Sequence, residues 1–136
     1  MIPVIYWSGT GNTKIMAESV VEAIKNAGQE AALYEVNEIT PAQAAEYNAL
    51  ALGCPAMGAE VLEEYEFEPF FQELEGLLKD KKVALFGSYG WGGSYMQDWQ
   101  LRVQQAGANL VADGVLALNT PDDTALSECA ILGKKL

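Results

Sequence analysis

The chain contains no histidine, only 2 cysteines and only 8 basic residues among its 136. Without histidine there can be no Ser–His–Asp triad, no Cys–His pair and no histidine-ligated zinc. Cys54 and Cys129 lie far apart and form no CxxC pair, which excludes a dithiol redox motif and a zinc ribbon. We therefore expect two free thiols in a reducing cytoplasm rather than a disulfide.

Positive charge is scarce as well. The 19 acidic residues outnumber the 8 basic ones and give a formal net charge of −11. Nucleic acids and anionic membrane surfaces both require clustered cations, so neither is an expected partner. No apolar run approaches the roughly 18 residues needed to span a bilayer, and the first residues lack a signal-peptide pattern. A cytoplasmic protein is the expectation.

What the chain does have is apolar character. Apolar residues make up 50% of it, enough for the core of one domain over residues 1–136. Short and almost wholly apolar runs occupy residues 2–7, 49–53 and 83–87, as in strands buried on both faces of a parallel sheet. Residues 31–36 and 109–118 are weaker strand candidates.

Apolar residues recur at helical spacing between these runs, so helices should alternate with strands. The alternation predicts a three-layer α/β fold with a doubly wound, five-stranded parallel sheet, and the strand order 2-1-3-4-5 fits it. Ligands of such sheets bind at the carboxyl ends of strands 1, 3 and 4. The predicted inward-facing helical residues are Ala17, Val20, Val21 and Ile24; Phe67, Phe70, Phe71, Leu74 and Leu78; Met96, Trp99, Val103 and Ala106; and Leu126, Cys129 and Ala130 within 124–136.

A polar loop, Ser8-Gly9-Thr10-Gly11-Asn12-Thr13, follows the first predicted strand and opens the first predicted helix. Backbone N–H groups at a helix N-terminus form an anion site, and glycine allows the anion close to the backbone. The loop matches neither GxGxxG nor GxxxxGK[ST], so the dinucleotide and P-loop readings fail. It suits a phosphate monoester, although a polar turn that caps the helix through Thr10 or Asn12 is the plain structural alternative.

Two further loops, residues 54–60 and 88–93, follow the third and fourth predicted strands. Trp91 stands in a glycine-rich segment at the predicted ligand edge, where an aromatic ring can stack on a planar ligand. Met57 can supply an apolar contact to the opposite face of that ligand. Alternatively, the side chains of Met57 and Trp91 could pack beneath their loops and have no role in binding. Among the remaining aromatic residues, we expect Trp99 in the core, Tyr6 under a helix and Trp7 in packing with its polar tip near the site.

At this point the sequence resembles the flavodoxins, small carriers of flavin mononucleotide (FMN). The resemblance covers the whole chain and is closest to the short-chain type found in anaerobic bacteria. It is carried by the 8–13 loop, by Ala56-Met57-Gly58 with Glu60, and by Gly87-Ser88-Tyr89-Gly90-Trp91-Gly92. It implies the flavodoxin-like fold and a low-potential electron-transfer protein, not an enzyme. FMN would bind non-covalently and shuttle single electrons as neutral semiquinone and anionic hydroquinone.

The resemblance also implies contacts to the cofactor. Glu60 would accept a hydrogen bond from the flavin N3–H, and Met57 and Trp91 would enclose the ring. The Met57–Gly58 peptide would turn its carbonyl toward the ring in the semiquinone. Pro55 and Ala59 depart from residues that other members carry. The implied cofactor-binding set is Ser8, Gly9, Thr10, Gly11, Asn12, Thr13, Pro55, Ala56, Met57, Gly58, Ala59, Glu60, Ser88, Tyr89, Gly90, Trp91 and Asn119, without a metal.

An acidic cluster beside the loop 54–60 raises the question of partners. Long-range steering by such a cluster would attract redox proteins with basic docking surfaces, whereas a solvated charged face is the plain alternative. A monomer is expected for a small acidic carrier. The cluster comprises Glu60, Glu63, Glu64, Glu66 and Glu68.

Three other functions fit the sequence less well. A quinone or flavin reductase on the same fold would need a second substrate pocket, and no insertion or dedicated basic residue for one is visible. A phosphoacceptor receiver needs acidic residues after strands 1 and 3, where Tyr6-Trp7 and Gly53-Cys54 stand. A cofactor-free interaction module would leave the three loops without a purpose.

Overall fold

A computed structural model describes residues 1–58 and 60–136 of the chain. Its parallel sheet has the order β2-β1-β3-β4-β5, and β6 also pairs with β4. The predicted doubly wound α/β fold and its strand order are thereby confirmed. The strands are β1 (Ile2–Tyr6), β2 (Ala31–Glu35), β3 (Ala49–Gly53), β4 (Lys82–Tyr89), β5 (Asn109–Leu110) and β6 (Val115–Leu118). The helices are α1 (Asn12–Asn26), η1 (Val36–Glu38), α2 (Pro41–Ala44), α3 (Phe67–Glu75), α4 (Tyr95–Gln105) and α5 (Asp123–Lys134).

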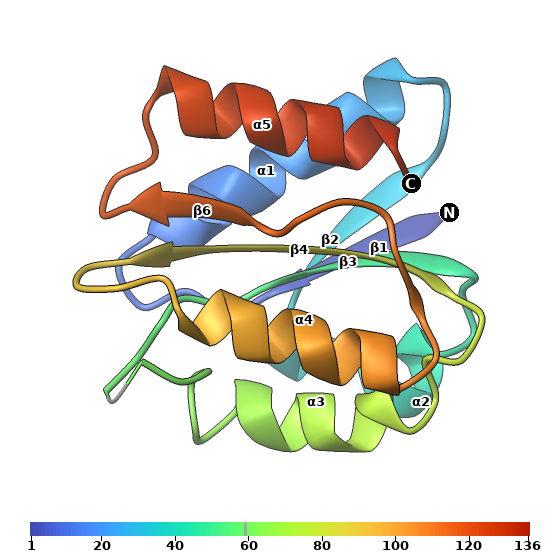
Figure 1. Ribbon diagram of the computed structural model, residues 1–136. Coiled ribbons are helices and arrows are strands. Elements are labelled where there is room, and N and C mark those ends of the chain that lie inside the picture. Colours follow the sequence, from blue (N-terminus) through green and yellow to red (C-terminus); the bar gives the residue numbers. More distant parts are fainter. Residues whose placement is uncertain (59) are drawn as a thin grey trace.

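Helices cover both faces of the sheet (Figure 1): α1 and α5 lie on one face, and α3 and α4 on the other. Successive side chains of a strand point to opposite faces, so each central strand feeds two cores. In β3, Leu50 and Leu52 pack with the aromatic residues of α3 and α4, whereas Ala51 packs with α1 and α5. This double burial explains why the central strands are continuous apolar runs.

The fifth predicted strand is not continuous. Residues 109–118 form two short strands, β5 and β6, that pair with opposite ends of β4. Between them the Gly114 N–H donates to the side chain of Gln100 in α4 instead of joining the ladder. The backbone of Gly114 also lies so close to Met96 that a Cβ would come within 2.4 Å of its sulfur. Contact with α4 therefore interrupts the strand.

Other differences from the predictions are smaller. β4 extends through Tyr89 because Ser88 and Tyr89 pair with Ala117 and Leu118, so these two residues lie on the strand and not in the loop after it. In α5 the buried positions include Ala125, Cys129 and Leu132, while Leu126 and Ala130 are only partly buried. Cys129 is free, as is Cys54. In the described part of the chain, the helices are all too short or too polar to cross a membrane.

Candidate functional site

The loops at the carboxyl edge of the sheet are tied to one another by main-chain hydrogen bonds. The Trp7 N–H donates to the Gly53 carbonyl at 3.0 Å, which joins the ends of β1 and β3. The Ala56 N–H donates to the Ser88 carbonyl at 2.9 Å, and the Asn119 N–H to the Tyr89 carbonyl at 2.8 Å. Residues at or just after the carboxyl ends of β1, β3, β4 and β6 are thus held at one edge, as the sheet order requires.

The first of these loops leaves the N-terminus of α1 without a conventional cap. Its N-cap residue is Gly11, at φ 96°, and no side chain of the N-cap position accepts from the first turn. Ser8 Oγ accepts from the Gly11 N–H at 2.9 Å, and Thr10 Oγ1 from the Asn12 N–H at 3.4 Å. The first turn of α1 also contains no acidic residue. Of the capping turn considered for Thr10 or Asn12, only the long 3.4 Å bond from the Asn12 N–H to Thr10 is formed. The first turn of α1 therefore remains suited to an anion.

A cleft of about 240 Å³ opens beside this helix end. Its walls come from the ends of β1, β3, β4 and β6, and ten predicted site residues line it: Gly9, Thr10, Asn12, Pro55, Ala56, Met57, Ser88, Tyr89, Gly90 and Asn119. Trp7 lines the cleft too, whereas the sequence predicted a packing residue with only its polar tip near the site. Its position directly before the polar loop was the available signal.

The remaining described residues of the predicted set do not line this cleft: Ser8, Gly11, Thr13, Gly58, Glu60 and Trp91. Thr13 is 1% exposed and Ser88 5%, and their hydroxyl oxygens are 3.2 Å apart. This buried pair joins the first turn of α1 to β4. Ser8 and Gly11 belong to the same polar loop as the residues that line the cleft. Ala59 lies outside the described residues.

The loop after β3, called the ring loop below, is closed by a β-bridge. Met57 and Val61 form an antiparallel bridge, with N–H···O distances of 2.8 and 3.1 Å. Gly58 has φ 54° and Glu60 has φ 60°, so both adopt a left-handed conformation. The Met57 carbonyl accepts from the Val61 N–H. The rotation of the Met57–Gly58 peptide that the resemblance implies must therefore break this hydrogen bond, which costs free energy.

The two side chains proposed to enclose a planar ligand are both exposed. Trp91 is 97% exposed and Met57 is 40% exposed. An indole this open contributes little to the core, unlike Trp99, which is 1% exposed between α3 and α4. Tyr6, at 3% exposure, is buried as expected. Trp91 is thus available to a ligand without any repacking of the core.

Glu60 is turned toward the start of α4. Its Oε2 accepts from Ser94 Oγ at 2.7 Å, and its carboxylate lies against Gly92, where a Cβ would come within 2.6 Å of Oε1. Glu60 does not line the 240 Å³ cleft. A hydrogen bond from Glu60 to a ligand in the cleft would require its carboxylate to leave or share Ser94.

The acidic cluster is less uniform than the sequence indicates. Glu63 is 4% exposed and is not part of a solvated face. Glu68 pairs with Arg102 at 2.7 Å, and Glu66 accepts from Trp7 Nε1 at 3.2 Å. The cluster therefore divides into Glu63 and Glu68, which hold the fold, and the exposed Glu64 and Glu66, of which Glu66 is also bonded to Trp7.

Cys54 adjoins the cleft but has no features of a reactive thiol. It is fully buried, and burial raises the pKa of its thiol far above the ordinary range. Its carbonyl accepts from Tyr95 Oη at 2.8 Å, a contact that requires glycine at position 87 because a Cβ there would lie 2.0 Å from that carbonyl oxygen. Cys54 thus anchors the end of β3 to α4.

These features fit a phosphate monoester attached to a planar ring. The α1 N-terminus offers N–H groups and hydroxyls for the phosphate, with the cleft beside them. Asn119 Oδ1 lies 3.5 Å from where a Cβ at Gly90 would stand, which is ordinary contact distance, so the loops after β4 and β6 are adjacent. The exposed Trp91, which follows Gly90 of the cleft wall, provides a flat apolar surface. FMN combines this phosphate with this kind of ring.

Comparison with known proteins agrees with this geometry. A family model described as Flavodoxin matches residues 4–133. Flavodoxins from Clostridium beijerinckii and Megasphaera elsdenii are each 43% identical to this chain, over 98% of it and 96% of their own length. The solution structure of two-electron reduced Megasphaera elsdenii flavodoxin superposes with a TM-score of 0.90, covering 99% of this chain and 97% of the other. The chain therefore belongs to the flavodoxin family and is an FMN-binding electron-transfer protein rather than an enzyme.

Proposed function

We propose that this protein carries single electrons on an FMN held between the N-terminus of α1 and the loops after β3 and β4. When bound, FMN supplies the redox chemistry. The observation that carries the proposal is the α1 N-terminus beside the cleft, with the 97% exposed Trp91 directly after Gly90 of the cleft wall. A phosphate and a planar ring satisfy both features at once.

The chain's own residues have distinct parts in this proposal. Hydroxyls of Ser8, Thr10 and Thr13, the Asn12 amide and the N–H groups of the loop would hold the phosphate dianion without a cation, through the helix dipole and neutral donors. Met57 and Trp91 would enclose the ring. Pro55, Ala56, Ser88, Tyr89, Gly90 and Asn119 would form the walls, in keeping with their position around the cleft.

Acidic groups near the ring would set a low reduction potential. Glu60 lies on the turn after Met57, and the whole chain carries a net charge of −11. Negative charge added in the cleft would be repelled by both. The tight turn at Gly58 would govern which backbone group faces the ring, because its left-handed conformation is open to glycine at little cost.

Stepwise anaerobic reduction of the FMN-loaded protein, followed by visible absorbance, tests this proposal. We expect a yellow protein that turns blue before it bleaches, since a one-electron carrier must stabilise its half-reduced form. Direct bleaching from yellow would indicate two-electron chemistry, and a purified apoprotein that does not bind FMN would contradict the proposal altogether.

We further propose that the partners are redox proteins with basic surfaces and that the protein acts as a cytoplasmic monomer. Glu64, Glu66 and the 87% exposed Tyr65 lie beside the loop that bears Met57. The cytoplasmic location is supported by the free, buried thiols of Cys54 and Cys129, which are typical of a reducing compartment. Electron-transfer rates to a basic haem protein should fall steeply with added salt. Rates that are independent of salt would contradict electrostatic docking.

A further inference from the structure

A buried carboxylate, Glu63, lies between the ring loop after β3 and α3. Its Oε1 accepts from the Tyr65 N–H at 2.6 Å. Its Oε2 accepts from the N–H groups of Glu66 and Phe67, both at 2.9 Å. The N-cap residue of α3, Glu66, makes no side-chain capping bond of its own. Glu63 therefore caps α3 from outside, and the N–H donors and the helix dipole compensate its charge.

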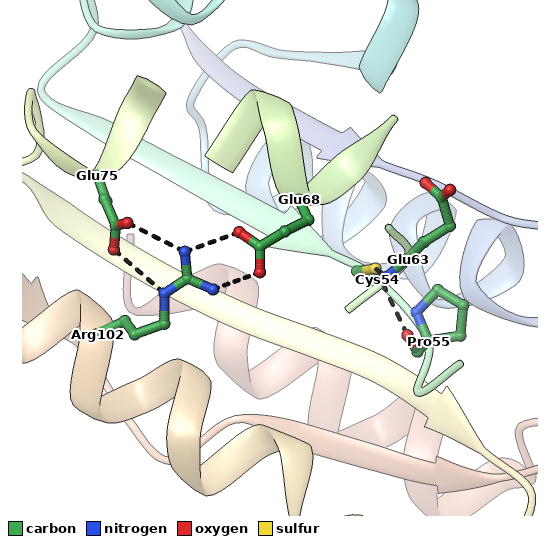
Figure 2. A network of polar contacts seen from close by, with 6 residues as sticks. All are labelled: Cys54, Pro55, Glu63, Glu68, Glu75 and Arg102. Carbon is green, nitrogen blue, oxygen red and sulfur yellow. Dashed lines mark hydrogen bonds and ion pairs between the residues drawn. The ribbon is translucent and has the colours of Figure 1, made fainter. Parts of the chain in front are cut away.

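The same residue closes the base of the ring loop. The Glu63 N–H donates to the sulfur of Cys54 at 3.4 Å, and the Cys54 thiol donates to the Pro55 carbonyl at 3.5 Å. Figure 2 shows the Glu63 backbone against this sulfur, with its carboxylate directed away from it. Cys54 is itself fixed to α4 through Tyr95. Both ends of the segment 54–63 are therefore held together, and the Met57 turn projects from a closed base.

Glu63 is also connected to the phosphate side of the cleft. The Glu63 carboxylate accepts from the backbone N–H of Glu66, and the side-chain carboxylate of Glu66 in turn accepts from Trp7 Nε1. Trp7 lines the cleft, and its ring lies 3.1 Å from where a Cβ at Gly9 would stand. A chain of contacts thus runs from the ring loop through Glu63 and Glu66 to Trp7 and the polar loop 8–13.

We propose that Glu63 is a positioning residue for the cofactor site, which fixes the ring loop and the phosphate loop relative to each other through α3. It lies behind the cleft walls and acts through Cys54, Glu66 and Trp7. The inference rests on the proposed function, since it concerns the affinity of the same cleft for FMN. Its sequence neighbour Glu64 is exposed, so the role belongs to the buried carboxylate and not to the acidic cluster as a whole.

Glu63→Gln tests this role because it keeps the shape and removes one of the two acceptor oxygens. The loosened segment must then be ordered when FMN binds, which costs affinity. Weakening a helix cap of this kind changes an equilibrium constant by about tenfold, so the Kd for FMN should rise about tenfold. The two midpoint potentials of the bound FMN should also move closer together, because the turn at Gly58 is held less firmly.

Arg102→Gln is the matched control for stability. Arg102 pairs with Glu68 at 2.7 Å and Glu75 at 3.0 Å, and so fastens α3 to α4 away from Glu63 (Figure 2). This variant should lower the free energy of unfolding in urea and leave the Kd for FMN within about twofold of wild type. Glu73→Gln, an exposed change on the same helix, controls for the lost charge and should leave both quantities unaltered.

Trp7→Phe tests the link independently, with the Glu63 cap intact. It removes the hydrogen bond to Glu66 but keeps an aromatic ring, and should raise the Kd about threefold. It remains informative if Glu63→Gln fails to fold.

Selective loss of FMN affinity in Glu63→Gln and Trp7→Phe, in folded apoproteins, supports the positioning role. Unchanged affinity in Glu63→Gln overturns it. So does a weakening in Arg102→Gln that is as large as in Glu63→Gln at equal loss of stability, because Glu63 would then act only through the fold. If Glu63→Gln does not fold, unchanged affinity in Trp7→Phe overturns it. Wild-type protein that binds no FMN would instead refute the proposed function, and the inference with it.

Discussion

At the scale of single residues, the two tryptophans Trp91 and Trp99 show how position decides the use of one side chain. Trp99 is 1% exposed and makes edge-to-face contacts with Phe67 and Phe71, at centroid distances of 5.4 and 6.0 Å. Trp91 is 97% exposed. The first contributes to folding through burial, whereas the second leaves its apolar surface free for a ligand.

Replacement of Trp91 should therefore separate binding from stability. Trp91→Ala should weaken FMN binding about tenfold or more, because stacking on an aromatic ring is worth about 1 to 3 kcal/mol. The free energy of unfolding of the apoprotein should stay within about 0.5 kcal/mol of wild type. Fluorescence titration with FMN and urea denaturation measure the two quantities. Equal FMN affinity in the variant would remove Trp91 from the site.

Gly58 gives a second residue-scale prediction. A side chain in the left-handed region costs roughly 1 kcal/mol, so Gly58→Ala should strain the turn that we propose faces the ring. The maximum amount of half-reduced protein during anaerobic reduction should fall. Gly76→Ala is the control, since Gly76 has an ordinary φ of −70° and open space around it. Identical reduction spectra for the two variants would refute a role for the turn.

At the scale of elements, the helix N-termini differ in a way that separates structure from function. Glu63 caps α3, and Asp122 caps α5 by accepting from the Ala125 N–H at 2.8 Å. The N-terminus of α1 has a glycine N-cap and no acidic residue in its first turn. Carboxylates stabilise a helix at this end, so their absence from α1 leaves the N–H groups and the dipole to an external anion.

An acidic residue at this position should have opposite effects on stability and on binding. Asn12→Asp should stabilise the apoprotein by about 0.3 to 1 kcal/mol through the helix dipole. It should also weaken FMN binding at least tenfold, because a carboxylate would face the phosphate dianion across the cleft. Riboflavin lacks the phosphate and should bind both proteins alike. Parallel losses for FMN and riboflavin would show that the phosphate does not lie at α1.

At the scale of the whole molecule, both thiols are sealed inside the two cores. Cys54 and Cys129 have no measurable exposure, and burial raises the pKa of the Cys129 thiol from 9.0 to about 12. The unfolded chain loses this proton above about pH 9, while the folded chain keeps it to about pH 12. Folding therefore binds an extra proton in that window, and stability falls as the pH rises through it.

The consequence is measurable by urea denaturation between pH 8 and pH 10.5. Wild type should lose stability more steeply above about pH 9 than Cys129→Ala, with a difference approaching about 1.4 kcal/mol per pH unit from this one group. Below pH 8 the difference in stability between the two proteins should be constant. Parallel curves across the whole range would show that the folded thiol titrates normally.

Much of this architecture was predictable from the sequence because it follows from local patterns. The runs at 49–53 and 83–87 had to be strands buried on both faces, and the spacing of Phe67, Phe71 and Leu74 had to be a helix face. With helices between parallel strands, the order of the sheet leaves few alternatives, and the polar loop 8–13 must come to the edge where ligands bind. The sequence also determined the absence of histidine chemistry.

The tertiary structure alone decided which residues meet. The last strand is interrupted because Gly114 contacts Met96 and Gln100 of α4, which belong to a different element. The sequence does not distinguish the glutamates that follow Met57, yet Glu63 is buried among backbone N–H donors while Glu64 faces solvent. Burial, unlike periodicity, depends on distant chain segments that close over a side chain. For that reason the sequence by itself determined the sheet and its binding edge, whereas packing decided that Trp7 lines the cleft and that Glu63 holds the loops in place.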